Sequence, residues 1–161
     1  MLIATIGSGP YNFFLFLHIV AAIVGFGAVL LNGVYGAQAK KRPGPGGLAI
    51  TEANFFVSTK IAEPVIYLVP LFGFALIGLS DSGWTFSQTW IDVSLVLYVI
   101  GLANARLVLV PTTAKMIDMM RAGPPDPAKM EAAGKRLAAA GGFAHLIFTA
   151  IMVMMIWKPG L

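Results

Sequence analysis

Residues 11–36, YNFFLFLHIVAAIVGFGAVLLNGVYG, contain no Lys, Arg, Asp or Glu. About 20 mostly apolar residues in a helix cover the ~30 Å hydrocarbon core of a bilayer, so this stretch is long enough to cross a membrane. Three further apolar stretches follow at residues 61–79, 90–113 and 137–157. None of them alternates with period two, and backbone groups in lipid must be satisfied internally. The sequence therefore predicts an all-α, polytopic membrane protein built as a bundle of four transmembrane helices.

Composition supports this class and leaves little room for anything else. Of the 161 residues, 58% are hydrophobic and 11% are charged, and the mean hydropathy is +0.83. Four spans use up most of a chain of this length, so we expect a single domain covering residues 1–161. The chain has no cysteine, which excludes disulfides, thiolate metal sites and iron–sulfur ligation. Any redox chemistry would need a bound cofactor.

The basic residues indicate how the chain crosses the membrane. A pI of about 9.6 is common among nucleic-acid-binding proteins, but here the basic residues gather at two of the three breaks between spans. We therefore expect no nucleic-acid partner. Positive charge concentrates on cytoplasmic loops. We therefore expect a multi-pass protein of the bacterial inner membrane with both termini outside, whose basic loops contact lipid head groups. The nine residues that follow the rule are Lys40, Lys41, Arg42, Lys60, Lys115, Arg121, Lys129, Lys135 and Arg136.

Several residues mark the expected helix ends and kinks. Thr51 is a candidate N-cap for the second helix, and Asp126 followed by Pro127 is a candidate start for the fourth. Pro64 and Pro70 lie inside the second helix, where each removes a backbone donor and leaves a carbonyl for neighbouring helices to satisfy. We expect Trp84 and Trp90 to anchor the outer ends of the spans.

The only two histidines, His18 and His145, both fall inside spans. Each has small residues at helical spacing along its face, which lets a helix or a flat cofactor approach closely. Both stripes are interpreted as facing the bundle. One hypothesis is that the histidines ligate a metal or a b-type haem, since imidazole suits both. The other is that each bonds a neighbouring helix. Counted from Tyr11 and Trp157, the two lie about 8 Å apart in depth at ~1.5 Å per residue, a large offset for two ligands of one haem. Ligation by both histidines of one chain, by a single histidine, or by histidines shared across a dimer therefore all stay open.

Glu63 and Arg106 are the charged residues at membrane depth in the second and third spans. Antiparallel neighbouring helices would bring them to a similar level, so we expect an intramembrane ion pair. The pair either neutralises two costly charges or serves a function, such as guiding a proton or holding a cofactor carboxylate.

Residues 14–27, FLFLHIVAAIVGFG, resemble the opening helix of a group of bacterial four-helix membrane proteins. The group includes the copper-resistance D-type proteins, the four-helix protoporphyrinogen oxidase and an uncharacterised family of predicted integral membrane proteins. The last agrees in length, span count and the His of the fourth helix. In the haem-associated members the helix-one His, matching His18, is taken as a haem or metal ligand. Where the oxidase is expected to carry a lysine in helix three, this chain has Arg106.

Three functions remain open from the sequence. The first is b-type haem binding or membrane redox work through His18 and His145. The second is transport of a small solute or metal ion past Glu63 and Arg106. The third is a structural or assembly role, packing as a homo-oligomer or on a membrane partner subunit. No Ser/His/Asp arrangement, paired catalytic carboxylates or Gly-rich phosphate loop is found, so the sequence does not identify an enzyme.

The charge distribution makes the orientation testable. In intact cells, Ser82→Cys should react with a membrane-impermeant thiol reagent and Gly46→Cys should not, because the positive-inside rule places their loops on opposite sides. The native chain has no cysteine, so the parent protein is an unlabelled control. Labelling at position 46 instead would reverse the orientation.

Overall fold

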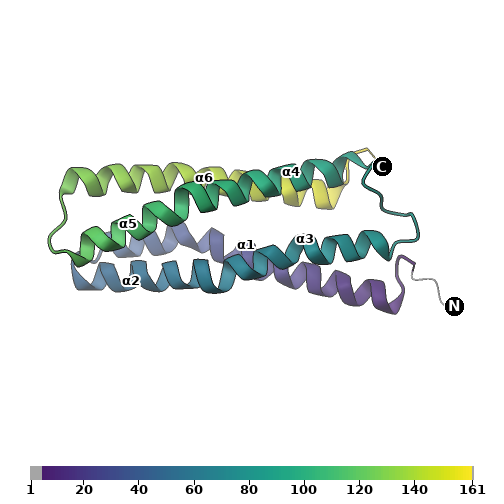
Figure 1. Cartoon of the computed structure of the whole chain (residues 1–161), viewed down its shortest axis with the longest axis horizontal. Coiled ribbons are helices and arrows are strands. Elements are labelled where there is room, and N and C mark those ends of the chain that lie inside the picture. Colours follow the sequence, from purple (N-terminus) through teal and green to yellow (C-terminus); the bar gives the residue numbers. More distant parts are fainter. Residues whose placement is uncertain (1–4, 161) are drawn as a thin grey trace.

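Four long helical rods make up the chain (Figure 1). The computed structural model describes residues 5–160, and every regular element in that range is helical. The rods are α1 (Gly9–Lys40); α2 (Pro45–Phe56) continued by the π-helical segment η1 (Val57–Ala62) and α3 (Glu63–Gly78); α4 (Thr89–Asn104) continued by the π-helical segment η2 (Ala105–Leu109) and α5 (Val110–Arg121); and α6 (Pro127–Trp157). All four are long and apolar enough to cross a membrane. The predicted all-α, four-helix class is confirmed.

The rods are 31–34 residues long, longer than the apolar stretches, because turns and caps decide where they end. Asp126 caps α6 as predicted, accepting from the backbone N–H of Ala128 at 2.9 Å. The prediction that Thr51 starts the second helix was wrong. That helix begins at Pro45, after Gly44 turns the chain with φ +76°. Thr51 lies within it and donates to the Gly47 carbonyl, a local bond that a mid-helix threonine makes readily.

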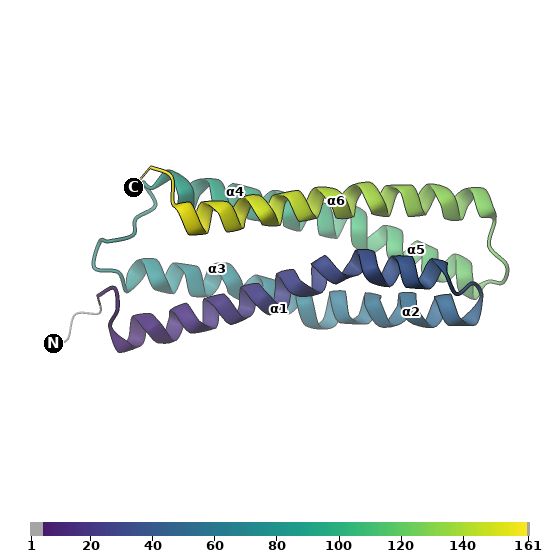
Figure 2. The same ribbon diagram turned by 180° about the vertical axis from the view of Figure 1, so that it is seen from behind.

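The rods form two layers of two (Figures 1 and 2). α1 packs on α2 and α3, whereas α4 packs on α6, and the layers meet through α1 with α6 and α2 with α5. Both termini and the 79–88 loop lie at one end of the bundle, here called the terminal end. The turns at residues 41–44 and 122–126 lie at the other, here called the basic end.

The core that joins the two layers lies at mid-bundle. Phe26 of α1 stacks on Phe148 of α6, with ring centroids 4.4 Å apart. The rest of this buried cluster consists of Ala144, Ile147 and Ile151. Many large apolar side chains instead face outward; Leu107 and Leu146, for example, are each 71% exposed. Such an apolar exterior is what lipid requires and water disfavours.

Prolines inside the second and third rods are accommodated in two ways. η1 and η2 each end two residues before a proline, Pro64 and Pro111. Just before each proline, the backbone N–H bonds five residues back instead of four. This wider turn accommodates a ring that cannot donate. Pro70 follows the sequence prediction instead. The carbonyl it leaves free, Ile66 O, receives the hydroxyl of Tyr98 from α4 at 3.4 Å.

Aromatic residues close the terminal end. Trp84 in the 79–88 loop donates its indole N–H to the Tyr11 hydroxyl at 2.8 Å. Its ring meets Trp90 edge to face at 5.5 Å, and the Lys158 ammonium lies 4.2 Å from its centroid. Trp90 is only 7% exposed, so its ring packs inside this end of the bundle instead of lying in the lipid interface as expected. These contacts tie the loop to both layers.

Close packing of α1 on α3 depends on Gly25. A methyl group there would lie 2.6 Å from Cγ1 of Ile66, whereas one at Gly27 would meet nothing within 4 Å. Gly25→Ala should therefore destabilise the protein by about 1–3 kcal/mol, the usual range for overpacking. Gly27→Ala is the matched control and should change stability by no more than about 0.5 kcal/mol. Thermal melts in detergent compare the two. Equal melting temperatures of the two variants would mean that α1 and α3 can move apart to make room for the methyl group without loss of stability.

Candidate functional site

His18 of α1 is held against the backbone of α3. Its Nδ1 lies 2.9 Å from the carbonyl oxygen of Val69. A carbonyl only accepts, so this bond places the hydrogen on Nδ1 and leaves the lone pair of the neutral ring on Nε2. Gly73 faces the ring, and a methyl group there would touch it at 3.5 Å. The carbonyl thus fixes both the tautomer and the orientation of His18, as the second shell of a metal-bound histidine does.

His145 of α6 makes a weaker contact of the same kind. Its Nε2 lies 3.3 Å from the carbonyl oxygen of Val29 on α1. By the same reasoning Nε2 carries the hydrogen and Nδ1 the lone pair. This bond lies in the interface between the two layers, next to the Phe26–Phe148 stack, and it links α1 to α6.

The structure does not bring the two histidines together. His145 lies beside Val29, which is 11 residues along α1 from His18. That separation is about 16 Å at ~1.5 Å per residue. Two imidazoles on one metal have nitrogens only ~4 Å apart, since each metal–nitrogen bond is ~2 Å. The two side chains therefore do not share one metal or one haem within a single chain.

Other metal ligands are not gathered around either histidine. Within residues 5–160, no group of three or more His, Cys, Asp or Glu side chains is placed to hold a metal ion. A haem makes a smaller demand on the protein, because the porphyrin supplies four nitrogens and one imidazole can complete the iron's ligation. His18 offers one such imidazole, with Nε2 free of the Val69 bond.

The small residues near the histidines serve two different surfaces. On the His18 face the expectation is confirmed only for the half of the stripe near His18, where Ala21 and Gly25 are buried and Gly25 receives Ile66. Farther along α1, Gly33 and Gly36 are exposed. Near His145 the interpretation was wrong. Ala138, Gly142 and Thr149 are exposed on the outer face of α6. Lipid is as apolar as the bundle interior, so small residues alone do not tell which of the two they face.

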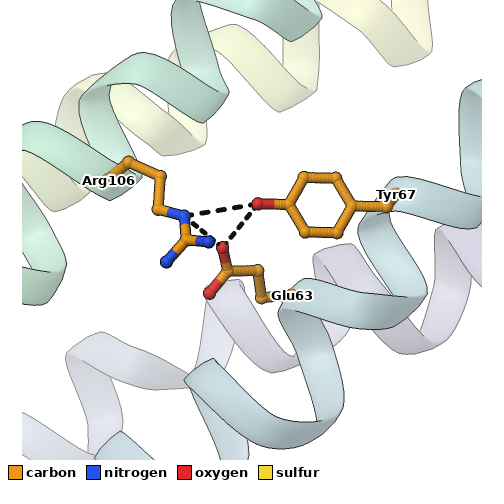
Figure 3. Close-up of polar contacts among 3 residues, drawn as sticks. All are labelled: Glu63, Tyr67 and Arg106. Carbon is orange, nitrogen blue, oxygen red and sulfur yellow. Dashed lines mark hydrogen bonds and ion pairs between the residues drawn. The ribbon is translucent and has the colours of Figure 1, made fainter.

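Glu63 and Arg106 form the expected ion pair (Figure 3). Arg106 Nε lies 2.6 Å from Glu63 Oε1, and it also donates to the Tyr67 hydroxyl at 3.3 Å. Tyr67 in turn donates to the same carboxylate oxygen at 2.6 Å. The Glu63 side chain is 14% exposed and the Arg106 side chain 56%. The acid is thus enclosed, while much of the guanidinium faces outward.

Tyr67 is the member of this group that the sequence reasoning missed. It lies four residues after Glu63 on the same helix, the spacing at which helical side chains meet. That spacing was the available signal.

Two other polar residues at membrane depth hold helices together. Asn32 of α1 accepts from the Ser58 hydroxyl at 3.1 Å. Asn104 of the third rod donates to the Ala140 carbonyl on α6 at 2.9 Å. Both bonds satisfy groups that lipid cannot, and we assign them a structural role.

Comparison with known proteins places the chain at the level of a family. Residues 13–159 match the family model described as "Predicted integral membrane protein (DUF2269)". Neither a curated protein nor a solved structure matches. The resemblance to the uncharacterised membrane family is confirmed, whereas no match shows the likeness to the copper-resistance D-type proteins or to the protoporphyrinogen oxidase.

The geometry of the ion pair predicts unequal effects of single substitutions. Arg106→Gln leaves an enclosed carboxylate without its cation, whereas Glu63→Gln leaves an arginine that is already half exposed. We expect both changes to lower the melting temperature in detergent, Arg106→Gln the more. The double variant should lose less than the sum of the two, because it strands neither charge. Tyr67→Phe should have a smaller effect of its own. Additive losses would show that the residues do not interact.

Proposed function

The chain belongs to a family of predicted integral membrane proteins, and we propose that within the membrane it binds a b-type haem through Nε2 of His18. The observation that carries this proposal is the Nδ1–H bond from His18 to the Val69 carbonyl. That bond presents the other nitrogen as a lone-pair donor before any ligand arrives. A haem held in this way would supply one-electron chemistry within the bilayer.

The chain's own residues would orient the ligand. Val69 holds the imidazole plane, and the absent side chain of Gly73 lets the ring lie close to α3. Stiff anchoring of this kind limits the rotation of an axial ligand. His145 has a different part in the proposal. It stays on the Val29 carbonyl and holds α6 to α1, since it is too far away to reach the same iron.

Two further proposals concern placement and an alternative activity. The basic end would face the cytoplasm, as the charges of its turns suggest.

The runner-up function is passage of a small solute or ion along the Glu63–Arg106 seam. Its support is that η1 and η2 interrupt the second and third rods beside this pair, and π-helical segments are frequent at functional sites. Flux into liposomes that Glu63→Gln abolishes would favour that function. If neither flux nor bound haem is detected, the remaining function is that of a structural subunit.

The haem proposal predicts a difference between the two histidines. Protein purified from haem-replete cells should show a Soret band and, when reduced, sharp visible peaks. His18→Ala should remove or shift these bands, because the iron loses its axial imidazole. His145→Ala is the matched control, since it deletes an intramembrane imidazole that bonds a carbonyl in the same way, and it should leave the spectrum unchanged.

Gel filtration and far-UV circular dichroism establish that each histidine variant is folded. A parent protein that stays colourless after haem is added would end the proposal. So would a spectrum that survives His18→Ala in folded protein.

A further inference from the structure

A second candidate binding site lies on the outer surface where the second and third rods face each other. Arg106 lies in η2 and Lys60 in η1, and both side chains are exposed. α3 packs mainly on α1, and α4 mainly on α6. Where the second and third rods face each other, side chains such as Arg106 therefore bridge them, and Arg106 remains exposed at the surface.

Arg106 is oriented by contacts at only one part of its guanidinium. Nε of Arg106 contacts both Glu63 and Tyr67, and 56% of the Arg106 side chain remains exposed. The outer edge, with its two Nη groups, has the fork geometry that binds a phosphate or carboxylate through two N–H groups. The ion pair thus holds a cationic edge in place toward the membrane.

The charges of Glu63, Arg106 and Lys60 leave one positive charge unbalanced. Glu63 and Arg106 cancel, and Lys60 adds a positive charge one turn nearer the basic end. Among residues 5–160, Lys60 makes no ion pair or side-chain hydrogen bond. The net charge of this group of three is therefore +1, which a singly charged anion balances.

The surroundings favour an amphiphile over a free ion. Lys60 lies on the exposed stripe of the second rod that continues through Pro64, Tyr67 and Leu71 toward the terminal end. Leu71 is 57% exposed, and Ile61 beside Lys60 is 46% exposed. Lys60 lies where the apolar stretch of the second rod begins, at the level of a headgroup, whereas Arg106 lies inside the third span with an exposed side chain. Long basic side chains near the ends of spans extend toward the headgroups, and the apolar residues farther in can lie along an acyl chain.

From this juxtaposition we propose that Arg106 and Lys60 bind the phosphate of an anionic phospholipid in the leaflet at the basic end. A headgroup with no cation of its own fits a +1 site better than a zwitterionic one, in which the ammonium offsets the phosphate. The proposal does not depend on haem, because none of its residues contacts His18, and it is tested on haem-free protein.

The test compares lipid retention by native mass spectrometry after titration with phosphatidylglycerol or phosphatidylcholine. The parent protein should bind phosphatidylglycerol preferentially. Lys60→Gln should weaken that binding about fivefold, the equivalent of roughly 1 kcal/mol for a basic residue at the membrane surface. The double variant Glu63→Gln/Arg106→Gln removes the fork without stranding a charge, and it should lose the preference. Lys41→Gln is the control, an exposed lysine in the turn at the same end.

Three results would overturn the proposal. One is equal retention of the two lipids by the parent protein. Another is the same loss from Lys41→Gln as from Lys60→Gln, since general attraction to the basic end would then explain the binding. The third is displacement of phosphatidylglycerol by an equal concentration of oleate, which would identify the ligand as an amphiphilic carboxylate.

Discussion

A side-chain N–H group or a free carbonyl inside a bilayer needs a partner from the protein, because no water is present to provide one. Most of the polar side chains at membrane depth in this protein find that partner on the backbone of another helix. His18, His145 and Asn104 each donate to a carbonyl of another helix. Tyr98 donates to the one that Pro70 leaves free. These bonds fix how the helices lie against one another, so the positions of the histidines follow from the same requirement that holds the bundle together.

The two layers are joined at several levels. Trp84 and Lys158 close the terminal end, and the Phe26–Phe148 stack fills the middle. Glu63 and Arg106 bridge the second and third rods nearer to the basic end. Between α2 and α5, Arg121 pairs with Glu52 at 2.7 Å. Of these contacts, only the Phe26–Phe148 stack is made by two buried side chains. The two ion pairs link the same two rods at positions where at least one of the paired side chains is exposed.

Some of this architecture could be predicted because it depends on local signals. Uninterrupted apolar length predicts spans, and Asp126 before Pro127 predicts a helix start. The Glu63–Arg106 pair follows from two charges at comparable positions in antiparallel spans. Thr51 misled because its hydroxyl has a partner inside a helix as well as at a cap. Here the start of the helix depends on Gly44, whose left-handed backbone ends the preceding turn.

The arrangement of the histidines could not be read in the same way. Counting residues inward from Tyr11 in α1 and from Trp157 in α6 assumes that these two residues lie at the same depth and that neither helix is tilted. The contact of His145 with Val29 shows a different register, set by the Phe26–Phe148 packing. The outward face beside His145 was misread for another reason. In water an exposed face is polar, but in lipid it is apolar like the interior. The pattern of small and apolar residues therefore does not tell which face of the helix points to the bundle.

The length of the rods has a consequence for where this chain meets water. Helices of 31–34 residues extend for about 50 Å at ~1.5 Å per residue, and the hydrocarbon core is only ~30 Å thick. The remainder, roughly 20 Å, extends beyond the hydrocarbon core into the headgroup region and the water outside it, mainly at the basic end where the polar residues lie. The four rods therefore present a helical platform beyond the hydrocarbon core. The same four rods continue into the membrane, so a molecule that binds to this platform contacts helices that extend directly into the bilayer.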